Sequence, residues 1–295
     1  MVVIKTAKRV GAVSSGPEWG ASFASASTGA MSFYDEIMVP RLFEPWAELL
    51  LDEVEPQSGE AVLDIACGPG TVTRQAAHRV GKSGRVTGCD LSPAMLELAR
   101  SKISFEGSAP IDYRECPADS LAVSDHAFDV VTCQQGVQFF PDRAAALREM
   151  RRVLRPGGRL GIAVWGAIED SPPFAALANA VEQILGVEDA DTYRAGPWGF
   201  GDSDSLLQLV QDNGFSDVSL RRRELPVVFE GGPTQLFLTL HAASVAAKLA
   251  QLSETDLSAF EVAAEEACRL ITHDGIVRSY ATSHVVTASV NDTTE

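Results

Sequence analysis

The sequence predicts an α/β protein built on an open, mostly parallel sheet. Val62, Leu63 and Ile65 are strand formers, and they lead through a glycine-rich turn at residues 67–70 into a helical pattern at residues 72–80. Strand and helix patterns then alternate up to residue 165, which gives five predicted strands. Such alternation is typical of parallel sheets, because each strand needs a crossover to return to the same edge.

The composition is that of a globular protein. With 295 residues and 45% hydrophobic content, the chain can bury a sizeable core. No apolar run approaches the roughly 20 residues that span a bilayer, so we expect a cytoplasmic protein with no membrane partner. The formal net charge of −16 repels phosphate backbones and argues against nucleic acid as a partner. The cysteines and histidines have no metal-ligand spacing, so no metal is expected.

The N-terminal part has two segments of different character. Residues 1–30 are rich in Ser, Ala and Gly and predict a flexible tail. The rest, residues 31–295, is expected to form one domain. It starts with apolar residues at helical spacing over residues 32–54, which we interpret as a helical cap. Within it, Tyr34 and Trp46 either cover a ligand or belong to the core.

The glycine-rich turn indicates a ligand-binding corner. Gly68 and Gly70 allow positive φ and close backbone approach, and the following helix directs free N–H groups over the turn. A dinucleotide fingerprint requires a third small residue where this chain has Thr73, and the Gly-Lys-Ser/Thr of a phosphate loop is absent. A nicotinamide-dependent oxidoreductase is therefore the less favoured alternative.

The second predicted strand, residues 85–90, ends in an acid. Asp90 lies one crossover helix after the glycine-rich turn, where an acid accepts hydrogen bonds from ribose hydroxyls. The alternative is that Asp90 caps the helix that follows. Ser92 is the better candidate for that cap, so we expect Asp90 to bind a ribose.

Two further strands follow with loops at the same edge of the sheet. The third, residues 111–116, leads into a turn with Ala118 and Asp119, which either contacts an adenine ring or is an ordinary turn. The fourth, residues 128–133, leads into the loop at residues 134–142. We expect this loop to lie above the position of the reacting group.

The remaining elements complete the sheet. A helix at residues 143–154 ends in a Pro-Gly-Gly turn before the fifth strand, residues 159–165. A helix near residues 206–212 and strands at residues 218–228 and near 284–290 follow.

Two segments are longer than simple connections require. Residues 171–190 and 233–272 read as helices rich in Ala and Leu. We expect these insertions to cover the substrate. A peripheral helical pad or a homodimer surface is the alternative.

The motif D-x-x-C-G-P-G, which begins at Asp64, resembles the first motif of class I S-adenosylmethionine-dependent methyltransferases. With Asp90 and Asp119 at the next two positions, the chain is similar over residues 59–165 to the small-molecule group related to ubiquinone/menaquinone biosynthesis enzymes. The resemblance implies a seven-stranded Rossmann-like sheet with an antiparallel last strand. It also implies S-adenosyl-L-methionine as the cofactor and a small-molecule methyl acceptor.

The site assignments join this resemblance to the strand positions. Asp64 is assigned to the methionine amino group, Asp90 to the ribose and Asp119 to the adenine. The complete set assigned to the cofactor is Tyr34, Asp64, Ala66, Cys67, Gly68, Gly70, Asp90, Leu91, Met95, Ala118, Asp119, Gln134, Gln135 and Gly136. The substrate is assigned to Gln138, Phe139 and Trp165.

The chain departs from the usual sequence motif of the family at one place. The family often has His-His where this chain has Gln138 and Phe139, which removes a possible base, so no catalytic residue is assigned. Methyl transfer depends mainly on aligning nucleophile, methyl group and sulfur, and a base is optional. We therefore expect O- or C-methylation of a small aromatic or lipophilic metabolite. The alternative is an enzyme of another reaction type, such as a cyclase, that retains the cofactor structurally.

Overall fold

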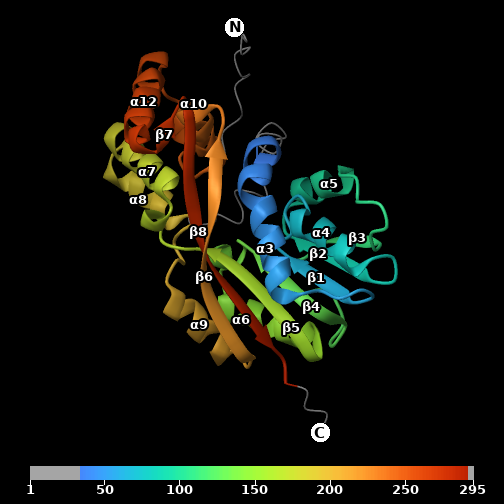
Figure 1. The fold of residues 1–295 in the computed structure, drawn as a ribbon. Coiled ribbons are helices and arrows are strands. Elements are labelled where there is room, and N and C mark those ends of the chain that lie inside the picture. The colour runs from blue at the N-terminus through green and yellow to red at the C-terminus, as the bar shows by residue number, and fades with distance from the viewer. Residues whose placement is uncertain (1–33, 292–295) are drawn as a thin grey trace.

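The computed structural model describes residues 34–291, so the predicted tail at residues 1–30 lies outside the described residues. The strands are β1 (Ala61–Ile65), β2 (Arg85–Asp90), β3 (Ile111–Glu115), β4 (Phe128–Gln134), β5 (Leu154–Trp165), β6 (Ser216–Phe229), β7 (Thr272–His273) and β8 (Ile276–Ser289). They form one sheet in the order β3-β2-β1-β4-β5-β8-β6, and β7 pairs with β8 (Figure 1).

The sheet confirms the predicted fold class. Strands β1 to β5 are parallel to one another, and β8 lies between β5 and β6 and is antiparallel to both. The short β7 is an eighth strand that the sequence did not predict. It forms a hairpin with the start of β8, which begins at Ile276 rather than near residue 284.

The helices and helical turns of the first half are η1 (Tyr34–Phe43), α3 (Glu44–Val54), α4 (Thr71–Val80), α5 (Pro93–Ser101), η2 (Val137–Phe139) and α6 (Arg143–Val153). Those of the second half are η3 (Ile168–Asp170), α7 (Pro172–Leu185), α8 (Val187–Ala195), α9 (Ser203–Asp212), α10 (Gly232–Phe237), η4 (Leu238–Ala242), α11 (Ala246–Leu249), α12 (Glu254–Ala267) and η5 (Arg269–Ile271). Within residues 34–291, none of these helices is long and apolar enough to cross a membrane.

Helices cover both faces of the central strands because alternate residues of each strand point to opposite faces. Strand β1 is buried along its whole length. Its Val62 packs with apolar residues of α3 and α4 on one face. Its Leu63 packs with residues of α6 and α9 on the other. This two-sided burial explains why Val62 and Leu63 are both apolar although they point to opposite faces of the sheet.

The predicted cap at the start of the domain is two elements. Residues 34–43 form the wider π-type helix η1 with Pro40 inside it, and the regular α3 follows. Trp46 of α3 is only 1% exposed, so it belongs to the core rather than to a ligand cover.

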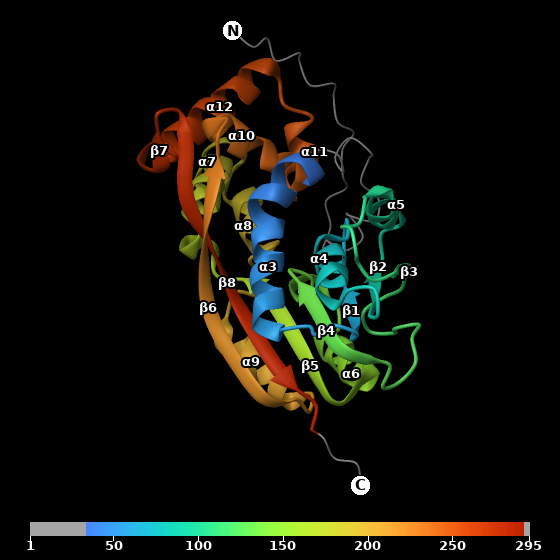
Figure 2. The same cartoon turned by 45° about the vertical axis from the view of Figure 1, so that its right-hand side comes forward.

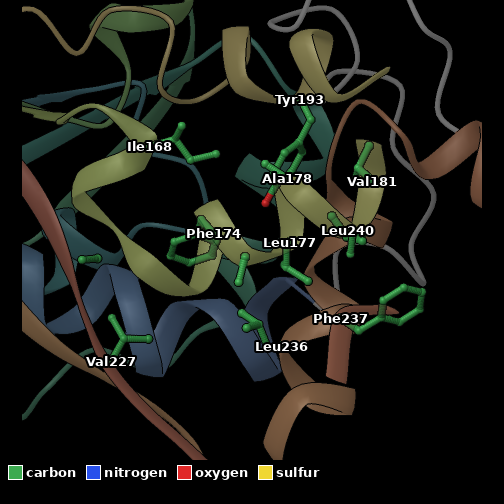
Figure 3. Close-up of a cluster of buried hydrophobic side chains, with 14 of the residues drawn as sticks. Ile168, Phe174, Leu177, Ala178, Val181, Tyr193, Val227, Leu236, Phe237 and Leu240 are labelled. Carbon is green, nitrogen blue, oxygen red and sulfur yellow. The ribbon is translucent and has the colours of Figure 1, made fainter. Parts of the chain in front are cut away.

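A second core lies at the far ends of β6 and β8. Both strands have 14 residues, and they run side by side from the sheet to the helices α7, α10 and α12 (Figures 1 and 2). Buried residues of these helices pack with β6 and β8, as Phe174, Leu236 and Val227 illustrate in Figure 3. The insertion predicted at residues 171–190 contains α7 and the start of α8. The insertion predicted at residues 233–272 is divided into several helices, of which α12, with 14 residues, is the longest.

Candidate active site

The glycine-rich turn joins β1 to α4 with three residues at positive φ. The φ angles are 55° at Ala66, 51° at Gly68 and 75° at Gly70. Gly70 caps α4 without a side chain, so the first N–H groups of the helix remain open to a ligand. Thr71, the first helical residue, has a buried hydroxyl with no hydrogen-bond partner among residues 34–291.

Asp64 lies beneath this turn. It is 1% exposed, and its two carboxylate oxygens accept hydrogen bonds from the hydroxyls of Thr73 at 2.6 Å and Thr132 at 3.0 Å. These bonds connect β1 to α4 and β4. Burial raises the pKa of Asp64 to about 7 and outweighs the lowering by the two hydroxyls. The carboxyl group is therefore a buried, titratable support of the turn.

Asp90 stands at the tip of β2, beside the turn. Its carboxylate oxygens accept hydrogen bonds from the backbone N–H groups of Gly68 and Ser92, both at 2.8 Å. The hydroxyl of Ser92 accepts from the N–H of Met95 and caps α5, which confirms the predicted cap. Each Asp90 oxygen retains a second lone pair that can accept from a ligand hydroxyl. Burial raises the pKa of Asp90.

The tips of β1 and β4 contact each other. A Cβ atom at Gly136 would lie 2.7 Å from Cβ of Ala66 and 2.8 Å from Sγ of Cys133, so only glycine fits there. The preceding residue, Gln135, has a φ of 54°. Such a conformation is costly for a residue with a side chain, and it is often found at functional sites.

The side chain of Gln134 connects β4 to the N-terminal helix η1. Its amide nitrogen donates to the backbone oxygen of Phe43 at 2.9 Å, and its Oε1 is buried with no partner among the described residues. The ring of Phe43 stacks on Tyr34 with centroids 5.0 Å apart and lies 6.2 Å from the ring of Trp165. Burial raises the pKa of Tyr34, and the negative charge of Asp90 raises it further.

The other assigned residues lie around these tips. Cys67 and Met95 are buried, Leu91 is 51% exposed, Ala118 is partly buried against the core and Asp119 is exposed. Gln138 is buried in η2, whereas Phe139 is half-buried. The structure therefore gathers Asp64, Asp90, Gln134 and Gly136 at one edge, with Asp119 in the loop that follows β3.

Sequence reasoning missed Tyr113. Its ring crosses Gly88 in β2, where a Cβ would lie 2.9 Å from Cδ1, and its hydroxyl contacts the position of a Cβ at Gly70. A glycine inside a strand indicates close approach by another group, and Gly88 was that signal.

Comparisons with known proteins agree with this geometry. The profile of the ubiE/COQ5 methyltransferase family matches residues 30–228. The chain belongs to this family. A curated relative from Shewanella baltica, a ubiquinone/menaquinone biosynthesis C-methyltransferase, is 32% identical over 189 residues, which are 59% of this chain and 73% of the relative. A relative of the same name from Hahella chejuensis is 35% identical over 172 residues, 54% of this chain and 67% of the relative.

Solved structures show the same fold. A putative methyltransferase from Bacillus halodurans has a TM-score of 0.54 at 20% identity, covering 83% of this chain and 98% of the other. Phosphoethanolamine N-methyltransferase 2 from Haemonchus contortus, solved with S-adenosyl-L-methionine, has a TM-score of 0.56 at 18% identity, covering 88% of this chain and 56% of the other. These identities are low, so the likeness concerns the fold alone.

This member of the ubiE/COQ5 family is thus an S-adenosylmethionine-dependent methyltransferase. Its structure fits that cofactor. Gln134 Oε1, at the end of β4, is a buried acceptor, and the Thr71 hydroxyl, at the start of α4, is a buried polar group, and neither has a partner among residues 34–291. A zwitterionic amino acid moiety requires an acceptor for its ammonium and a donor for its carboxylate.

Proposed function

We propose that this enzyme transfers a methyl group to a carbon or oxygen atom of a small aromatic or lipophilic molecule. The observation that carries the proposal is the aromatic cluster beside Gln134, in which Phe43 contacts both Tyr34 and Trp165. Aromatic rings accommodate a flat apolar acceptor and exclude water from the reacting atoms. The names of the curated relatives, C-methyltransferases of quinone biosynthesis, support a carbon of a quinol-like ring.

The residues at the strand tips would hold the cofactor as follows. Asp90 would accept from the ribose hydroxyls, and Gln134 Oε1 would accept from the ammonium group. The hydroxyl of Thr71 and the N-terminus of α4 would donate to the carboxylate. Asp64 would act on the amino group through its charge, because it is 1% exposed beneath the turn and its oxygens are held by the hydroxyls of Thr73 and Thr132. Ala118 and Leu91 would flank the adenine.

When bound, S-adenosylmethionine supplies an electrophilic methyl group on a sulfonium. The contribution of this chain is alignment. The contact between Ala66 and Gly136 and the anchored side chain of Gln134 fix the strand tips, so that an acceptor is held in line without a base. Proximity of this kind accounts for a large share of the barrier reduction in such displacements.

The test is a methyl-transfer assay with labelled S-adenosylmethionine and three probes: a 1,4-naphthalenediol, a catechol and a primary alkylamine. We expect label in the diol or the catechol, and the position of the label, read by NMR, separates C- from O-methylation. Label in the amine alone would contradict the proposal. S-adenosylhomocysteine is measured in parallel, because an enzyme that keeps the cofactor intact forms none of it.

A further inference from the structure

The side chain of Gln138 has a buried acceptor that the cofactor assignments do not use. Gln138 is 6% exposed in the turn η2, directly after the glycine that contacts the tip of β1. Its Oε1 is buried and has no hydrogen-bond partner among residues 34–291. A buried amide oxygen without a donor is unfavourable, so it indicates a position that a ligand donor completes.

The orientation of this side chain is set by its neighbours. The amide nitrogen of Gln138 donates to Oε1 of Gln135 at 3.4 Å, and the nitrogen of Gln135 donates to the hydroxyl of Ser283 at 2.9 Å. These two hydrogen bonds connect Gln138 and Gln135, in the loop after β4, to Ser283 of β8. Ser283 is paired with Trp165 of β5 in the sheet. The side-chain nitrogen of Gln138 therefore has a hydrogen-bond partner, whereas its Oε1 can accept a hydrogen bond from a ligand.

The backbone around Gln138 is fixed as well. Arg143 donates to the backbone oxygens of Val137 at 3.1 Å and Gln138 at 2.8 Å. Its guanidinium lies 4.3 Å from the ring centre of Phe200, in the loop before α9. Arg143 therefore positions η2 and also places a positive charge near it.

The groups around Gln138 indicate which kind of ligand donor its Oε1 can accept a hydrogen bond from. A neutral amide oxygen accepts from a hydroxyl or an N–H group, and the nearby Arg143 disfavours a cationic amine. Apolar side chains of Phe139 and Phe140 follow Gln138 directly in the chain. An amide does not remove a proton at neutral pH, so a hydroxyl bound there stays protonated and serves recognition. A hydroxyl on an aromatic ring meets each of these conditions.

We propose that Gln138, oriented by Gln135 and Ser283, is a specificity-determining residue that accepts a hydrogen bond from a hydroxyl on the methyl acceptor. This inference rests on the proposed function, since it presupposes an aromatic acceptor. It narrows the substrate to hydroxyarenes over their ethers, and it makes the bound hydroxyl distinct from the methylated atom.

The test is calorimetry with the full-length enzyme saturated with S-adenosylhomocysteine, which prevents turnover. The probes are 1,4-dihydroxynaphthalene, kept reduced under nitrogen, and 1,4-dimethoxynaphthalene. We expect the wild type to bind the diol about 10-fold more tightly than the ether, the scale of one buried hydrogen bond. Gln138→Met keeps the shape but removes the acceptor, so the two affinities should come within about 2-fold.

Two further variants make the result specific. Gln138→Glu retains an acceptor and should keep the preference for the diol. Gln211→Met, on the exposed side of α9, is the matched control and should behave as the wild type. A Gln138→Met enzyme that keeps the 10-fold preference would overturn the role of Gln138 and leave the aromatic acceptor in place. Wild-type enzyme that binds neither naphthalene would overturn the proposed function and this inference together.

Discussion

The contact between the tips of β1 and β4 can be tested by adding one methyl group. In Gly136→Ala, the new Cβ would lie 2.7 Å from Cβ of Ala66 and 2.8 Å from Sγ of Cys133, well inside normal contact distance. Gly136 has a φ of −105°, which alanine adopts without strain, so the cost is steric alone. Overpacking of this kind costs about 1–3 kcal/mol of unfolding free energy.

A second substitution isolates the pair. Ala66→Gly removes the Cβ with which the new methyl group of Gly136→Ala would collide. It also removes the backbone strain of a non-glycine residue at a φ of 55°, so alone it should change the unfolding free energy by less than about 1 kcal/mol. In the double variant, Gly136→Ala should be less costly by about 1 kcal/mol, because residues in contact couple by this amount. The collision with Cys133 remains, so rescue is partial.

Urea unfolding followed by tryptophan fluorescence measures these free energies, and calorimetry with S-adenosylmethionine measures the site. Gly107→Ala is the control. Gly107 has a φ of 81° and no atom within 4 Å of a Cβ, so its backbone cost of about 1 kcal/mol should be the same in the wild-type and Ala66→Gly backgrounds. If Gly136→Ala were equally destabilising in both backgrounds, the two tips would not touch.

Three other substitutions test separate parts of the molecule. Asp90→Ala should weaken S-adenosylmethionine binding by about 1–3 kcal/mol in calorimetry, and unchanged affinity would remove Asp90 from the site. Burial raises the pKa of Asp64 to about 7, so its contribution to stability is full below about pH 4 and is lost as the pH rises to 7. The wild type should lose about 1.4 kcal/mol of unfolding free energy per pH unit in this range, and Asp64→Asn should not. Urea unfolding at several pH values measures this difference, and equal pH profiles for the two proteins would contradict the raised pKa of Asp64. Glu53 of α3 forms salt bridges with Arg221 and Arg223 of β6. Because both arginines are partly exposed, Glu53→Gln should cost only about 1 kcal/mol, less at high salt, and no salt dependence would show the pairs to be inert.

The central strands could be predicted because their signals are local. Strands β1, β2 and β4 are short, mainly buried runs that end at a turn, and the choice between Asp90 and Ser92 as the cap follows from neighbouring positions. The long β8 was underestimated, because its first half owes its structure to pairing with β6, from which it is separated by the helical insertion. Sequence pattern carries little information about such distant pairing.

The same distinction applies to the site. The acids and glycines were found from their spacing, whereas the contacts that orient them join distant residues. Gln134 donates a hydrogen bond to Phe43, which is 91 positions away in the sequence, and Gln135 donates one to Ser283, which is 148 positions away. No local pattern predicts a hydrogen bond between residues so far apart in the sequence, so Ser283 was identified only from the folded chain.

The side chains of Gln138 and Phe139 have a physical consequence for the reaction, because neither of them acts as a base near neutral pH. Methyl transfer needs the acceptor, the methyl group and the sulfur in line, and a rigid tip provides that alignment without moving a proton. Here rigidity comes from the Ala66–Gly136 contact, and orientation of the recognition group comes from the amides of Gln135 and Gln138. An amide keeps one protonation state across the working pH range, as a histidine does not. Turnover should therefore follow the acidity of the acceptor and of Asp64, and Gln138→His should add a new dependence between about pH 6 and 7.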